Sequence, residues 1–125
     1  MRLRSKSEEP ANLRLEKALD AWRKRLGASG NKYVPVAEEE AVWASCDECV
    51  RRGNMQDAAA AYAKVALAFE SEGMFLKAIA AWKRASRLDP MRADTTAGLL
   101  RTYRLQGLDA EAKALEEAVR REAKH

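Results

Sequence analysis

The 125-residue chain is expected to adopt an all-α fold of about six helices. Alanine accounts for 25 of the 125 residues, whereas valine, isoleucine and threonine together account for ten. Alanine is the strongest helix former and β-branched residues favour strands, so the composition argues against a sheet-based fold. With 47% hydrophobic and 34% charged residues, the chain is typical of a one-domain globular protein with a packed core.

The first expected helix covers residues 11–26 and follows Pro10. Its apolar positions recur at three and four residues: Leu15, Ala18, Leu19, Trp22 and Leu26. Glycines, an asparagine and a proline then fill residues 27–35, which predicts a loop and a candidate hinge. We therefore expect residues 1–35 to form a basic N-terminal helix and linker, ahead of a helical domain over residues 36–125.

The positive charge is concentrated at the N-terminus. Residues 1–32 hold nine Lys or Arg and four acids, a net charge of +5, while residues 33–125 hold fourteen and fifteen, a net charge of −1. Such an excess can attract nucleic acid or acidic surfaces, but it can equally be a solvated face. Because the excess is small beside the basic footprint of nucleic-acid binders, we do not expect nucleic acid to be the main partner.

Five more short helices are expected after residue 35, separated by Gly53-Asn54, Gly73, Asp89-Pro90 and Gly107. The first of them is placed at residues 38–52, and Asn54 is expected to cap the second. Each segment keeps apolar residues at helical spacing. These are Val42, Cys46, Cys49 and Val50; Met55, Ala58, Ala59, Tyr62, Val65, Ala66 and Phe69; Phe75, Ala78, Ile79, Trp82 and Ala85; Thr96, Leu99, Leu100 and Tyr103; Ala112, Leu115, Ala118 and Val119.

An internal period of 34 residues joins Gly73 to Gly107 and Phe69 to Tyr103. A period of 34 with two helices per unit resembles the tetratricopeptide repeat, and residues 59–92 match its pattern closely. The expected large, small, aromatic, glycine and proline sites are occupied by Tyr62, Ala66, Phe69, Gly73, Ala78, Ala85 and Pro90. Residues 93–125 resemble a divergent terminal repeat, in which Thr96, Leu100 and Val119 depart from the pattern.

The resemblance implies a short right-handed α-solenoid of antiparallel helix hairpins, in which each unit buries its face against the next. Helix 38–52 is out of phase with the repeat and is expected to be an extra packing helix. Helix 11–26 and the charged last helix are expected to cap the two ends, a duty that a second copy of the chain could also perform.

No catalytic, cofactor-binding or metal-binding constellation is visible. The only histidine is the last residue, His125, and the acidic clusters 38–40 and 116–117 have no neighbouring nucleophile or base. Cys46 and Cys49 invite a redox or zinc interpretation, but no other zinc ligands accompany them. We therefore expect these cysteines to be small buried hydrophobes on one helix face.

In the family that the repeat resembles, the first helix of each unit lines a concave face that receives a peptide or helix. The residues at those places that we expect to bind a partner are Ala63, Leu67, Glu70, Ala97, Arg101, Arg104 and Leu105. The known carboxylate-clamp pattern is not present, because Ala63, Leu67, Ala97 and Arg101 stand where it needs Lys and Asn. An alanine-floored groove with leucines and arginines suits an amphipathic helix or an acidic segment.

The leading hypothesis is a non-catalytic protein–protein interaction adaptor or scaffold in the cytoplasm. No stretch reaches the length of apolar sequence that a membrane span needs, so membrane insertion is not expected. Two alternatives remain open: a chaperone or assembly subunit of a larger secretion or motility complex, and a nucleic-acid-associated protein. The latter would use the N-terminal cations Arg2, Arg4, Lys6, Arg14, Lys17, Arg23, Lys24 and Arg25.

Overall fold

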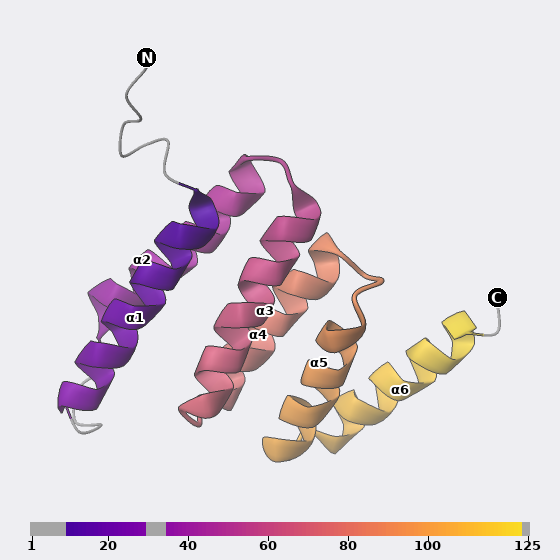
Figure 1. Ribbon diagram of the computed structural model, residues 1–125. Helices are drawn as coiled ribbons and strands as arrows, with labels where there is room; N and C mark the ends of the chain where they lie inside the picture. The colour runs from indigo at the N-terminus through magenta and orange to yellow at the C-terminus, as the bar shows by residue number, and fades with distance from the viewer. Residues whose placement is uncertain (1–9, 30–34, 124–125) are drawn as a thin grey trace. The chain divides into compact units, whose positions relative to one another are not determined.

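The computed structural model describes residues 10–29 and 35–123, and over these residues it contains six α-helices and no strand. The helices are α1 (Ala11–Ser29), α2 (Val36–Arg51), α3 (Met55–Ser71), α4 (Phe75–Leu88), α5 (Ala93–Leu105) and α6 (Asp109–Ala123). The all-α prediction and the helix count are confirmed (Figure 1). The N-terminal cations Arg2, Arg4 and Lys6 and the terminal His125 lie outside the described residues.

The chain divides into two compact units, one ending at Ala61 and the other beginning at Tyr62. The boundary between the units falls within α3. In the first unit, α1 packs along α2 as an antiparallel hairpin, so the N-terminal helix shares a core with the helix that follows it (Figure 1).

The hairpin of α1 and α2 is held together by the apolar stripe that the sequence predicted. Leu15, Leu19, Trp22 and Leu26 are all buried on α1, and Val42, Cys46 and Cys49 are buried on α2. Each fully buried leucine contributes roughly 1.5–3 kcal/mol by leaving water. At the edge of this core an ion pair joins Arg25 Nε to Glu38 Oε1 at 3.4 Å.

The two turns that lie 34 residues apart in the sequence have the same backbone geometry. Gly73 and Gly107 have φ angles of 75° and 80°, a region that favours glycine because it lacks a Cβ. The amide after each glycine donates back into the preceding helix, Met74 to Phe69 at 2.9 Å and Leu108 to Tyr103 at 2.7 Å. The same 6→1 bond therefore closes both helices, as in a Schellman motif.

Helices α4 and α5 pack closely because Gly98 leaves room for the ring of Trp82. The buried face of α5 is formed by Thr95, Gly98, Leu99, Thr102 and Tyr103. The sequence had instead placed Thr96 and Leu100 on that face, and both are only half-buried. The expectation was right for Leu99 and Tyr103 and wrong for Thr96 and Leu100, because the face of α5 that packs on Trp82 through Gly98 also includes Thr95 and Thr102.

Helix α6 packs on α5 and buries only Ala112 fully. Leu115 and Ala118 are half-buried, and Val119 keeps 42% of its surface exposed. The expected stripe on this helix is therefore only partly covered. The position 34 residues after Trp82 is Glu116, so α6 lacks the large ring with which α4 holds α5.

Candidate partner-binding site on α5

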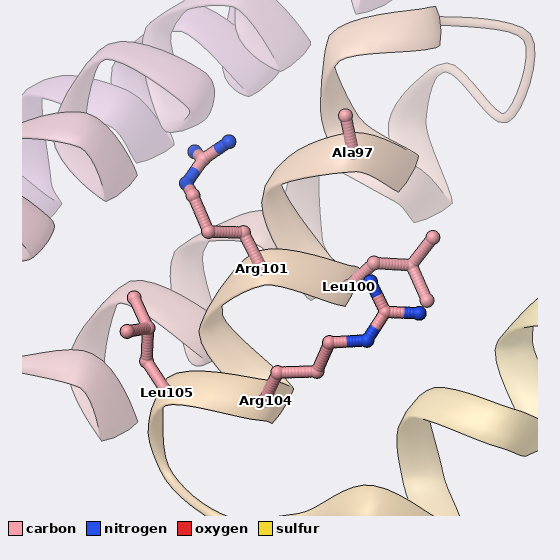
Figure 2. A pocket seen from close by; sticks show the side chains of 5 residues that line it. All are labelled: Ala97, Leu100, Arg101, Arg104 and Leu105. Atoms are coloured by element: carbon pink, nitrogen blue, oxygen red, sulfur yellow. The ribbon is translucent and has the colours of Figure 1, made fainter.

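An open hollow of about 460 Å³ lies along one side of α5. It is lined by Ala97, Leu100, Arg101, Arg104 and Leu105 (Figure 2). These residues recur at intervals of three and four, so they share the side of α5 that the core does not use. Within this side of α5, Figure 2 shows Arg101 near one edge of the hollow and Leu100 and Arg104 near the opposite edge, with Ala97 one turn earlier in the helix.

The hollow brings together four residues that the sequence assigned to partner binding: Ala97, Arg101, Arg104 and Leu105. Leu105 is 57% exposed, so a partner that covered it would remove apolar surface from water. Sequence reasoning missed Leu100, because the repeat pattern reserves its place for a small buried residue. Leu100 is larger than the small residue that the repeat expects at this position, and this difference in size could have predicted its partial exposure.

The carboxylate of Glu70 faces other residues of the chain, contrary to its expected role in partner binding. It accepts the indole N–H of Trp82 at 2.9 Å and two guanidinium N–H groups of Arg101 at 2.7 and 2.9 Å. Its side chain is 11% exposed. A carboxylate that holds three donors from two helices joins α3, α4 and α5, so we assign Glu70 a structural role.

The two arginines of the hollow are both paired, but their pairs differ in strength. The hydrogen bonds that Arg101 donates to Glu70 raise the pKa of Arg101 above its ordinary value, and the bidentate geometry fixes the guanidinium. Arg104 pairs with Glu116 on α6, and both side chains are well exposed, at 55% and 36%. Exposed pairs contribute little because water and salt screen them, so Arg104 can exchange Glu116 for another carboxylate.

Two further residues expected at the site do not line the hollow. Ala63 is buried, with 2% of its surface exposed, and offers a partner no contact area. Leu67 is 52% exposed on α3, on the turn that precedes Glu70. The hollow therefore includes only part of the predicted surface and is centred on α5.

Cys46 and Cys49 are buried and form no disulfide, as expected for small hydrophobes. Burial raises the pKa of the Cys49 thiol. Glu48, which lies between them in the sequence, accepts hydrogen bonds from Arg51 and Arg52 near the end of α2. These bonds lower the pKa of Glu48, and the bond from Arg51 has the larger effect. In residues 10–29 and 35–123 no three His, Cys, Asp or Glu side chains come together as metal ligands would.

Comparison of the chain with protein-family models, curated proteins and solved structures gives no match. Among the described helices, none combines the length and apolar character needed to cross a membrane.

Proposed function

We propose that the chain is a non-catalytic interaction adaptor that receives an amphipathic helix or peptide of a partner protein in the hollow on α5. The observation that carries the proposal is that the exposed Leu105 and the half-buried Leu100 both line an open hollow of about 460 Å³. Apolar side chains that line a concave surface gain free energy when a partner removes them from water.

The charges around the hollow support a partner that is mainly apolar on its docking face. Arg101 is already neutralised by Glu70, so it presents its aliphatic stem and the edge of a fixed guanidinium. Arg104 is held only by the exposed Glu116, and it is the residue that a carboxylate of the partner would engage. The docking helix would therefore carry leucine-sized side chains and one acidic residue.

The same proposal includes the wider architecture inferred from the 34-residue period. The matching turns at Gly73 and Gly107 support a repeat of the tetratricopeptide type, stacked as a right-handed solenoid. The proposed adaptor works in the cytoplasm, where buried thiols such as those of Cys46 and Cys49 stay reduced.

The test is a comparison of captured partners between two surface variants. Leu105→Asp places a charge in the hollow, whereas Leu13→Asp places the same charge on α1, where Leu13 is 41% exposed. Tagged versions of both variants and of the wild type are expressed in the native cell, and bound proteins are identified by mass spectrometry.

We expect a set of proteins that the wild type and Leu13→Asp retain and that Leu105→Asp loses. The two variants must have the same helicity and melting temperature for the comparison to hold. An unchanged set with Leu105→Asp would show that the hollow on α5 does not bind the partner.

A further inference from the structure

Helix α4 carries a concentrated positive charge. Its sequence contains Lys77, Lys83, Arg84 and Arg87, and it is the only one of the six described helices without an acidic residue. Lys83, Arg84 and Arg87 are exposed and lie in the last two turns of the helix. The exposed positions of the first two turns are apolar instead, with Leu76 62% exposed and Ala80 one turn further along. The exposed face of α4 is thus apolar in its first half and basic in its second.

Two of the exposed cations on α4, Lys83 and Arg87, differ from the arginines of the hollow on α5. Within the described part of the chain, Lys83 and Arg87 form no ion pair, whereas Arg101 and Arg104 are held by Glu70 and Glu116. Arg87 also lies in the last turn, where a cation stabilises the helix dipole. The helix dipole therefore accounts for Arg87 but not for Lys83, which lies one turn earlier.

Aromatic rings on both neighbouring helices hold two of these cations in place. Lys83 Nζ lies 6.0 Å from the centre of the Tyr103 ring on α5, and Arg84 Cζ lies 5.8 Å from that of Tyr62 on α3. Both rings are buried, so their positions are fixed by the core. A cation held over a ring loses less side-chain freedom when it binds an anion, which favours recognition.

We propose that the exposed face of α4 binds an acidic segment of a partner protein, which places carboxylates on Lys83, Arg84 and Arg87 and an apolar side chain on Leu76 and Ala80. A polypeptide can supply both kinds of contact, whereas a phosphate backbone supplies only charge. The three exposed cations also span only about 6 Å of helix axis, which is short for nucleic acid, whose affinity grows with the number of phosphates contacted.

The experiment uses the full chain and a short capped peptide with glutamates and leucines at helical spacing as the probe. Binding is followed by fluorescence anisotropy at several salt concentrations. One variant, Lys83→Gln with Arg87→Gln, removes two charges from α4. Its matched control, Arg120→Gln with Arg121→Gln, removes two charges from the exposed last turn of α6, so the two variants have the same net charge as each other.

The α4 variant is expected to bind the peptide about tenfold more weakly than the wild type, as the loss of two screened charge pairs implies, and the α6 control is expected to bind it unchanged. Wild-type affinity should fall as salt rises. Equal affinity of the two variants would overturn the proposal, because only net charge would then matter.

Two further probes separate this face from the other possibilities. A single-stranded oligonucleotide that binds more tightly than the peptide, and that loses affinity in the α4 variant, would overturn the choice of an acidic polypeptide. Because the hollow on α5 would accept a similar peptide, the α4 substitutions are also tested in a Leu105→Asp background, where they should still weaken peptide binding about tenfold. Loss of the peptide in Leu105→Asp alone would place the binding at the hollow and overturn the proposal.

Discussion

A Cβ atom added to Gly98 would overlap the indole ring of Trp82. Gly98 is in the middle of α5, where glycine costs about 1 kcal/mol in helix propensity relative to alanine. The helix nevertheless carries a glycine there, because the close packing of Trp82 of α4 needs the space. Thr102 supports the arrangement by donating its hydroxyl to the carbonyl of Gly98 at 2.7 Å.

Gly98→Ala is therefore expected to destabilise the protein although alanine is the better helix former. Forcing a methyl group into a packed contact costs typically about 1–3 kcal/mol, so we expect the free energy of unfolding to fall by that amount. Chemical denaturation followed by circular dichroism measures the change. Gly27→Ala is the matched control, because Gly27 is also helical and a Cβ there meets nothing within 4 Å. A stability gain in both variants would show that Trp82 does not need the glycine.

Replacing Glu70 should separate the hydrogen bond to Trp82 from the ion pair to Arg101. Glu70→Ala leaves the indole N–H without an acceptor and is expected to lower the free energy of unfolding by about 1–3 kcal/mol. Glu70→Gln keeps an acceptor for the indole and should cost less. The control is Glu116→Ala, which removes only an exposed partner of Arg104 and should change stability by less than about 1 kcal/mol. Equal losses for Glu70→Ala and Glu116→Ala would contradict a structural role for Glu70.

The matching turns predict matching responses to substitution. Gly73→Ala and Gly107→Ala each place a Cβ at a positive φ angle, which costs about 1–2 kcal/mol. Asparagine tolerates this region better, so Gly73→Asn and Gly107→Asn should be milder. Thermal unfolding of the four variants is the measurement. Alanine variants as stable as the wild type would mean that the turns relax into another conformation.

Patterns within each helix predicted the fold well, because they depend on neighbouring residues. The breakers at Gly53, Gly73 and Gly107 mark the ends of three helices, and Asn54 accepts the amide of Asp57 at 3.0 Å as the expected cap. The buried stripe of α1 was equally visible, since its apolar residues recur at helical spacing. Local periodicity thus located both the helices and most of their inner faces.

Contacts between distant residues could not be predicted in this way. Glu70 and Arg101 are 31 residues apart, and their pairing depends on how α3 and α5 are placed. The rotation of α5 likewise depends on Trp82, which lies on another helix. These contacts neutralise the hollow on α5 and leave α4 as the helix whose positive charge no acid of its own offsets. The absence of acidic residues from α4 was visible in the sequence, but its meaning depended on the pairing of Arg101 and Arg104.

The raised pKa of the Cys49 thiol predicts that stability falls at alkaline pH. Because burial disfavours the thiolate, the folded protein holds this proton more tightly than the unfolded chain does. The resulting stabilisation is complete below the ordinary pKa of a thiol and is lost as pH rises from there through the raised folded-state pKa. Denaturation of the wild type and of Cys49→Ala across this pH range measures the effect, which is a steeper decline of stability in the wild type.

Labelling of the thiol provides a second measurement. In a Cys46→Ala background, Cys49 should react slowly with iodoacetamide in the folded protein and quickly in denaturant, since the thiolate is the nucleophile. Rapid labelling of the folded protein would show that the thiol is accessible and that burial does not control its ionisation.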